Sequence, residues 1–180
     1  MVLIMGQLFL ASKPGTDAAV RIYRLAEVVK CARHFGGDLI VPHHLHITLF
    51  PLDDRRYSLQ HTVLKACEAA QEVRMPPFEV WFDRIGSFRG RPDNHAFVLL
   101  GGDGLSGLRL LRQTLGEAMV RKGLRHLVNK EFTPHITLLY DRRKVEEQPI
   151  EPIAWTVGEF VLIHSLYGHA HLARWPLRVE

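Results

Sequence analysis

The sequence contains little cysteine and no long uninterrupted apolar stretch. Only two of its 180 residues are cysteines, Cys31 and Cys67, and both fall within helical apolar patterns. Two such thiols do not make a disulfide framework, which favours packed, inert side chains and a cytoplasmic location. No stretch approaches the roughly 18 consecutive apolar residues of a membrane span, so we expect no membrane association.

The excess of positive charge is small. Lys and Arg together number 23 against 19 Asp and Glu, which gives a net charge of +4 with the eleven histidines neutral. This balance favours an anionic partner only mildly. Apolar residues make up 47% and charged residues 23%, as in a globular protein with a real core and unlike a disordered chain. We therefore expect one domain over residues 1–180, and a monomer.

The amino terminus is apolar but does not have the pattern of a signal peptide. It has no basic region, and Gly6 and Gln7 interrupt its apolar run. We interpret residues 7–11 as a buried strand.

Apolar periodicity then predicts the elements of the first half. A helix begins with Thr16 as its cap and ends at Gly36-Gly37, because apolar residues recur at spacings of three and four between them. A strand over 45–50 and a second helix from about Ser58 to the Pro76-Pro77 pair follow.

The second half repeats this order. We expect a strand over 78–82, a loop over 86–94, a strand over 96–100, a helix that ends at Gly123 and a strand over 135–139. The repeated order of strand, helix and strand indicates an internal duplication. After a charged loop at 141–148, the tail predicts strands over 156–163 and 169–179.

The two halves carry the same tetrapeptide pattern on corresponding strands. His46-Ile-Thr-Leu49 stands in the first half and His135-Ile-Thr-Leu138 in the second. Side chains alternate across a strand, so His and Thr share one face and the aliphatic residues share the other. A single copy would mean little, but two copies at matching places in a repeat predict two His and two Thr around one cleft.

Two imidazoles and two hydroxyls suit the chemistry of a phosphodiester. Histidine can be neutral or protonated near neutral pH, so one copy can accept a proton while the other donates one. Hydroxyl groups from Thr48 and Thr137 would hold the non-bridging oxygens between the two rings. This chemistry requires no metal and no cofactor.

Three segments of the sequence resemble the two-histidine phosphoesterases, and among them the LigT-like RNA 2',3'-cyclic phosphodiesterases, historically called 2'-5' RNA ligases. The likeness covers most of the chain. The segments are VPHHLHITL at 41–49, FTPHITL at 132–138 and SLYGHAHLARWPL at 165–177.

The resemblance implies an α+β fold of two pseudo-symmetric lobes, each an antiparallel sheet, with outer helices and a central cleft. It implies hydrolysis of 2',3'-cyclic phosphate ends of RNA or of small nucleotides to 2'-phosphates. Carried over by position, His46 and His135 are the catalytic pair, with His135 favoured as the base and His46 as the acid. Thr48 and Thr137 bind the phosphate.

Three positions depart from the family pattern. Tyr140 stands where relatives often have Arg, a change for which Arg142 or Arg143 in the adjoining loop would compensate. Phe50-Pro51 replaces a smaller residue and a Leu-Gly turn after the first motif, and His171 stands where many relatives have Tyr. We include Tyr140 and Arg142 among the substrate-binding residues.

The loop around Phe88 adds two further candidates for substrate binding. Phe88 can stack on a base, and the guanidinium of Arg91 can pair with a phosphate. Core packing of Phe88 fits the sequence equally well. Other basic residues either track an RNA backbone or coat solvated surfaces: Arg84, Arg89, Arg121, Lys122, Arg125 and Lys130.

Alternative functions remain at the level of the sequence. The chain could be a nucleotide-binding module without turnover, or could carry 2'-5' RNA ligase activity as a side reaction. A zinc hydrolase that uses His43, His44 and His46 is a further alternative, although no carboxylate or cysteine completes that set. His169 and His171 share one strand face, and either line the cleft or lie in solvent.

Overall fold

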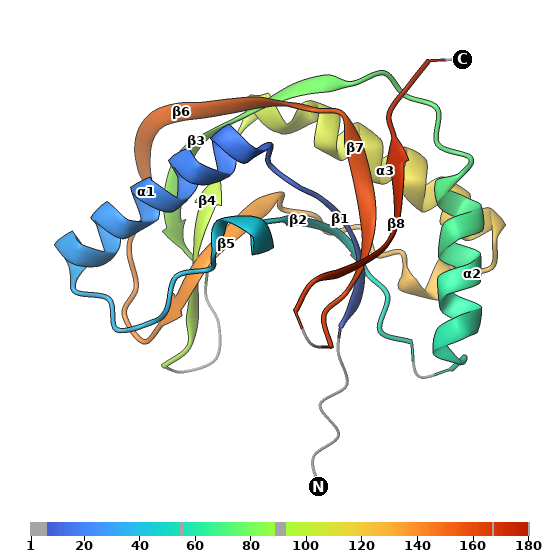
Figure 1. Cartoon of the computed structure of the whole chain (residues 1–180), viewed down its shortest axis with the longest axis horizontal. Helices are drawn as coiled ribbons and strands as arrows, with labels where there is room; N and C mark the ends of the chain where they lie inside the picture. The colour runs from blue at the N-terminus through green and yellow to red at the C-terminus, as the bar shows by residue number, and fades with distance from the viewer. Residues whose placement is uncertain (1–6, 55, 89–92, 167, 180) are drawn as a thin grey trace, which may run out of the picture.

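The computed structural model describes residues 7–54, 56–88, 93–166 and 168–179. Within these residues, eight strands form two four-stranded antiparallel sheets, with strand orders β2-β1-β7-β8 and β5-β4-β3-β6 (Figure 1). The predicted α+β fold of two lobes with outer helices is confirmed.

The first sheet combines the start and the end of the chain. Its strands are β1 (Leu8–Ser12), β2 (Ile47–Pro51), β7 (Glu159–His164) and β8 (Ala170–Pro176). β1 lies between β2 and β7. The last two strands therefore complete a sheet that the first two begin.

The second sheet comes from the middle of the chain. Its strands are β3 (Phe78–Ser87), β4 (His95–Leu100), β5 (His135–Asp141) and β6 (Gln148–Val157). β4 lies between β5 and β3, as β1 lies between β2 and β7. The two sheets thus share one plan, which the internal repeat predicted.

In the described part of the chain, three α-helices cover the sheets: α1 (Thr16–Arg33), α2 (Leu59–Ala70) and α3 (Ser106–Arg121). α1 follows β1 in sequence but crosses the other sheet, where Arg21 reaches the Pro152 carbonyl of β6. α3 follows β4 but packs beside α2 and donates from Arg112 to the Leu49 carbonyl of β2. α1 therefore lies on the partner sheet, while α3 contacts β3 of its own sheet and reaches β2 of the other, so both helices tie the lobes together.

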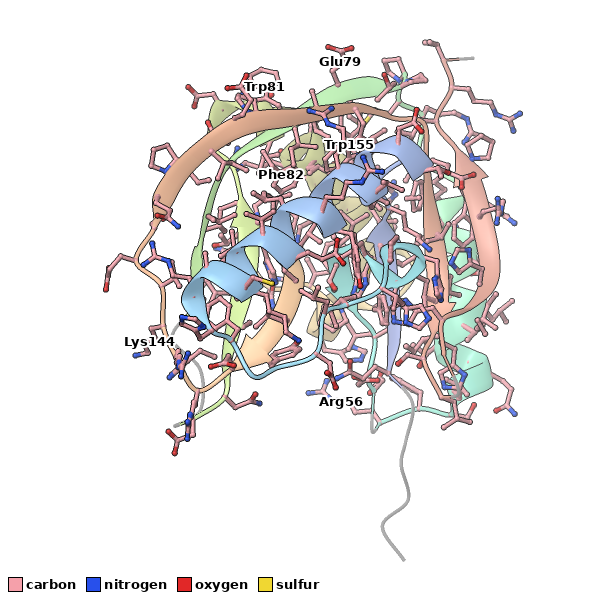
Figure 2. The ribbon with its side chains drawn as sticks, turned by 60° about the vertical axis from the view of Figure 1, so that its left-hand side comes forward. Arg56, Glu79, Trp81, Phe82, Lys144 and Trp155 are labelled. Carbon is pink, nitrogen blue, oxygen red and sulfur yellow. The ribbon has the colours of Figure 1, made fainter. Side chains whose placement is uncertain are left out.

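One buried apolar cluster runs through both sheets. In the second sheet, Phe82 of β3 stacks on Trp155 of β6 with ring centroids 5.2 Å apart (Figure 2). Trp81, the preceding residue, points to the opposite face and is 42% exposed. This is the alternation that a strand imposes.

Several predicted boundaries need correction. The amino-terminal cap of α1 is Gly15 and not Thr16, and the helix ends at Arg33 because His34 adopts a left-handed conformation with φ of 55°. β3 continues to Ser87, so the predicted loop over 86–94 begins too early. The predicted strand over 156–163 begins too early, since Thr156 and Val157 belong to β6, Gly158 intervenes, and β7 begins at Glu159.

Gly36 and Gly37, which we predicted to end the first helix, instead bind a carboxylate at the end of β5. The amides of Gly36 and Gly37 donate to Oδ2 of the buried Asp141 carboxylate at 2.7 and 3.0 Å. A Cβ at Gly37 would lie 1.9 Å from the Tyr140 carbonyl oxygen, so no other residue fits there. This contact holds the end of α1 against the end of β5.

Candidate active site

The two motif strands are the outer strands of their sheets, and they face each other. β2 forms the edge of one sheet and β5 the edge of the other, and the two strands are in contact. In both motifs the His and Thr side chains are partly exposed while the Ile and Leu side chains are buried. The predicted division into a polar face and a core face is present in both copies.

A β-bulge interrupts each motif strand at the same place. In the β1–β2 pair, Leu10 lies opposite Phe50 and Ala11 opposite Thr48, so Leu49 is the extra residue. In the β4–β5 pair, the register skips Leu138 in the same way. Because an extra residue reverses the alternation, the fifth residue after each motif His turns to the same face as that His. These residues are Pro51 and Tyr140.

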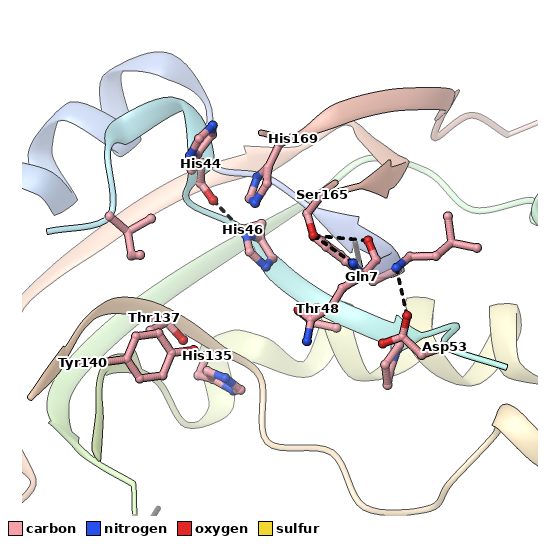
Figure 3. A pocket seen from close by; sticks show the side chains of 14 residues that line it. Gln7, His44, His46, Thr48, Asp53, His135, Thr137, Tyr140, Ser165 and His169 are labelled. Atoms are coloured by element: carbon pink, nitrogen blue, oxygen red, sulfur yellow. Dashed lines mark hydrogen bonds between the residues drawn. The ribbon is translucent and has the colours of Figure 1, made fainter. Parts of the chain in front are cut away.

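Both motifs line one cavity of about 340 Å³ (Figure 3). His46 and Thr48 line it from one lobe, and His135 and Thr137 from the other. Pro51 and Tyr140 extend these two walls, as the bulges require. The arrangement of two imidazoles and two threonine side chains around one cavity agrees with the prediction from the paired motifs.

The two motif histidines are oriented by the same hydrogen bond. Nδ1 of His46 lies 2.7 Å from the carbonyl oxygen of His44, and Nδ1 of His135 lies 2.7 Å from that of Thr133. A carbonyl oxygen accepts only, so each Nδ1 carries the proton and donates it. Each ring therefore keeps Nε2 for the cavity, as a proton acceptor when neutral and as a donor when protonated.

Burial lowers the pKa of His46 below its ordinary value, and the hydrogen bond to the His44 carbonyl offsets part of this fall. The nearby positive charges of Lys13 and His135 lower the pKa of His46 further. Burial also lowers the pKa of His135, again partly offset by its bond to Thr133. Without an anion in the cavity, both rings therefore favour the neutral form.

An aromatic ring supports each motif histidine. Phe9 of β1 stacks on His46 with centroids 4.8 Å apart, and Phe88 meets His135 edge-on at 4.7 Å. Phe88 thus lies beside a motif histidine, but it is not among the residues that line the cavity, so its predicted role in substrate binding stays a prediction. Its ring packs on the imidazole, so the packing alternative also describes its position.

Sequence reasoning missed Phe9 and left His169 undecided. His169 lines the cavity, and its ring lies 5.1 Å from that of His46 and 4.3 Å from that of His44. Burial, followed by the positive charges of His46 and His44, lowers the pKa of His169 to about 4. His169 is therefore neutral near pH 7. His171 lies apart from the cavity lining, with Nε2 3.4 Å from Nζ of Lys13.

Gln7, Asp53 and Ser165 complete the polar rim beside Thr48, and none of them was assigned to the site from the sequence (Figure 3). Their side chains or backbone are tied to strand β1: the Gln7 amide donates to Oγ of Ser165, and the Leu8 amide donates to Oδ1 of Asp53. These contacts between distant segments have no local sequence signal.

The remaining predicted substrate-binding residues have different outcomes. Tyr140 lines the cavity and is 50% exposed. Arg142 lies outside it and lines a neighbouring cavity. Arg143 donates to the carbonyls of Arg33 and His34 at the end of α1, so its guanidinium is engaged in the fold. Arg91 lies outside the described residues.

Arg112 of α3 connects the two motif regions from behind. Its guanidinium lies between the rings of Phe50 and Phe132, 4.5 and 4.6 Å from their centroids. It donates to the carbonyl of Leu49, next to Thr48, and to the carbonyls of Asn129 and Glu131, which precede the second motif. This buried cation therefore fixes β2 against the segment that leads into β5.

Several of the basic residues considered for RNA binding pair with carboxylates instead. Arg121 and Lys122 both contact Glu72, at 2.8 and 2.5 Å. Arg84 contacts Asp83 and Glu147, each at 2.9 Å. Because these side chains form ion pairs on the protein surface, their charges are partly neutralised and less available to an RNA backbone.

Among the described residues, no three His, Cys, Asp or Glu side chains are arranged to hold a metal ion. This includes the His43, His44 and His46 set of the zinc alternative. Within the same segments, none of the helices has the length and hydrophobicity needed to cross a membrane.

The duplicated lobes, with a matched histidine from each facing a common cavity, have the fold expected of a two-histidine phosphoesterase. Residues 15–168 match the sequence profile of the 2'-5' RNA ligase superfamily. The chain belongs to this superfamily, and the predicted resemblance to two-histidine phosphoesterases is confirmed. A search of curated protein sequences gives no match.

Solved structures agree with this assignment. E. coli LigT in complex with 3'-AMP is 26% identical, with a TM-score of 0.73, and the match covers 96% of this chain and 98% of that one. A protein described as a phosphoesterase is 25% identical, with a TM-score of 0.72, over 96% and 99% of the two chains. A Thermus thermophilus protein, TT0787, is 22% identical over 97% and 99% of the two chains and shares the fold with a TM-score of 0.72.

Proposed function

We propose that this chain hydrolyses 2',3'-cyclic phosphate ends of RNA or small nucleotides to 2'-phosphates, with His46 and His135 as a general acid and base pair. The observation that carries the proposal is the matched orientation of the two rings. Each imidazole donates from Nδ1 to the carbonyl two residues earlier and keeps Nε2 for the cavity that Thr48 and Thr137 also line.

The reaction begins with the phosphate held between the two motifs. Hydroxyl groups of Thr48 and Thr137 donate to the non-bridging oxygens, which carry the negative charge. That charge raises the pKa of both imidazoles relative to the empty cavity, because it favours their protonated forms. One protonated and one neutral ring then face phosphorus from opposite lobes.

Bond making and bond breaking follow in line. Neutral His135 accepts a proton from water at Nε2, and the water oxygen forms a bond to phosphorus. The bond from phosphorus to the 3'-oxygen breaks, and protonated His46 donates its Nε2 proton to that oxygen. The products are a 2'-phosphate and a 3'-hydroxyl. Exchange of protons with solvent returns both histidines to their starting states.

The relatives support a nucleotide as the ligand. LigT structures are described in complex with 3'-AMP, ATP and NADP+. All three molecules contain a nucleoside and phosphate. A phosphate in the cavity with a nucleoside attached to it is consistent with these complexes.

The proposal is tested by the product and by variants of the two histidines. Purified protein is incubated with 2',3'-cyclic nucleotides, and the position of the product phosphate is read by ³¹P NMR. We expect 2'-phosphates, and a loss of at least about 100-fold in kcat for His46→Gln and His135→Gln, a typical contribution of general acid or base catalysis. His43→Gln is the control, because His43 is exposed and does not line the cavity.

Other results would identify the alternatives. Binding of the nucleotide without turnover would indicate a binding module. A 2'-5' linked product, formed when an RNA 5'-hydroxyl replaces water as the nucleophile, would indicate ligase activity. A 3'-phosphate product would contradict the proposed direction of cleavage.

A further inference from the structure

A second cavity of about 380 Å³ adjoins the first, and Tyr140 lines both. It lies between the end of α1 and the end of β5, and its other lining residues include His34, Asn94 and Arg142. Pockets for one small ligand hold roughly 300–1,000 Å³, so each of these two spaces suits one nucleotide. The wall that they share is an aromatic side chain.

The position of Tyr140 follows from the bulge in β5. Thr137 lies opposite Val98, and Tyr140 lies opposite Ala96, so both project from the same face of the strand. In the other lobe the corresponding residue is Pro51. The two walls of the candidate active site therefore differ: one ends in a compact ring without a hydrogen-bond donor, and the other in a half-exposed phenol ring on which a base can stack.

The charges of the second cavity suit a polynucleotide. The guanidinium of Arg142 has no hydrogen-bond or ion-pair partner among residues 7–54, 56–88, 93–166 and 168–179, and its side chain is exposed. The neighbouring charges are already engaged, because Arg143 donates to carbonyls of α1 and Asp141 accepts from the amides of Gly36 and Gly37. Among the described residues that line this cavity, Arg142 is thus the arginine whose guanidinium is available to a ligand.

The remaining polar groups of the second cavity match a base more than a second phosphate. Asn94 offers an amide that can both donate and accept hydrogen bonds, and the nearby Asp93 carboxylate accepts from exocyclic amino groups. A carboxylate repels a phosphate, so we place the phosphate beside Arg142 and the base beside Asp93 and Asn94.

We infer that Tyr140 and Arg142 form a subsite for RNA, in which the terminal base stacks on Tyr140 and Arg142 contacts the phosphodiester that joins the terminal nucleotide to the preceding one. The base of the preceding nucleotide occupies the second cavity. This inference rests on the proposed function and specifies its substrate as an RNA end, in preference to a mononucleotide or a small cyclic metabolite.

The first test compares substrates of increasing size on the wild-type protein. The substrates are methyl riboside 2',3'-cyclic phosphate, adenosine 2',3'-cyclic phosphate and a dinucleotide that ends in the same cyclic adenosine. We expect kcat/KM to rise at each step, by about tenfold for the added base because of stacking and by about tenfold for the added nucleotide because of the contact between arginine and phosphate.

The second test assigns each step to its residue. Tyr140→Ala lowers the advantage of adenosine over the methyl riboside, whereas Tyr140→Phe retains it because the ring remains. Arg142→Gln lowers the advantage of the dinucleotide over the mononucleotide, and Arg142→Lys retains part of it. Arg109→Gln, an exposed arginine that lines neither cavity, leaves both ratios unchanged.

The outcomes separate the inference from the function on which it rests. If the wild-type protein hydrolyses none of the three cyclic phosphates, the proposed function fails. If it hydrolyses all three with equal kcat/KM, or if the variants change all three substrates by the same factor, the proposed function stands and the RNA subsite is wrong.

Discussion

His46 and His135 occupy equivalent positions in the two lobes: each donates its Nδ1 proton to the carbonyl two residues earlier, over 2.7 Å in both cases. His44 supplies one carbonyl and Thr133 the other. The backbone of each motif thus selects the tautomer of its own histidine, without a carboxylate to do so. The lobes present the same reactive atom, Nε2, to one cavity from two sides.

The low pKa of His169, whose ring lies beside that of His46, makes the stability of the fold depend on pH. Burial and neighbouring cations lower the pKa of His169 to about 4, against an ordinary value of 6.5. The unfolded chain therefore binds a proton in a pH range in which the folded chain does not, and stability falls as the pH falls from about 6.5 to 4. We expect the urea midpoint to decrease over this window.

A variant isolates this contribution. In His169→Gln the group that titrates is absent, so the decrease in the midpoint between pH 7 and pH 5 becomes smaller. Urea denaturation followed by circular dichroism measures both proteins. An equal decrease in the two proteins would show that His169 does not contribute.

Arg112 is expected to be the most costly arginine to replace. Arg112→Met leaves the carbonyls of Leu49, Asn129 and Glu131 without their donor and removes a cation from between two phenyl rings. The bond to the Leu49 carbonyl is buried, whereas those to Asn129 and Glu131 are only part-buried. A buried group left without its partner costs about 1–3 kcal/mol and the two part-buried carbonyls cost less, so we expect a total loss of about 2–4 kcal/mol. Urea denaturation measures it.

Arg109→Met is the matched control for that substitution. Arg109 lies on the same helix, but its side chain is exposed and, among the described residues, donates to the Gly102 carbonyl alone. We expect a change below about 0.5 kcal/mol, as is usual for a surface substitution. Equal effects of the two substitutions would refute the role of Arg112 in joining the motif regions.

The activity is expected to survive removal of metal ions. Nδ1 of His46 is engaged by a backbone carbonyl, and the described residues offer no convergent set of ligands. Dialysis against EDTA should therefore leave kcat unchanged in the assay with cyclic nucleotides. A loss of activity that added zinc restores would support the zinc hydrolase alternative.

The sequence predicted the features that repeat, because local patterns encode them. The His and Thr of each motif share a face because side chains alternate along a strand. The repeat of the motif on a second strand predicted that both pairs face one cavity. Ser58 was a correct helix start, since its hydroxyl accepts from the His61 amide.

Features that depend on distant segments were not predictable in this way. Phe9 belongs to a strand whose residues are all buried, so no alternation marks the side that faces His46. The bulge at Leu138 places Tyr140 in the cavity, and a bulge depends on the pairing with β4 and not on residue type. β6 was missed because Pro149, Glu151 and Pro152 obscure the pattern of a strand at the edge of its described sheet, beside β3.

The pH dependence of kcat/KM with adenosine 2',3'-cyclic phosphate tests the central claim most directly, since burial lowers the pKa of both His46 and His135 in the free protein. We predict a bell whose two limbs both lie below about pH 6.5, because the acid limb reports loss of the neutral base and the alkaline limb reports loss of the protonated acid. The residual activity of His135→Gln should lack the acid limb, and that of His46→Gln should lack the alkaline limb. A bell that keeps both limbs in either variant would contradict the assignment of these two histidines as the acid and base pair.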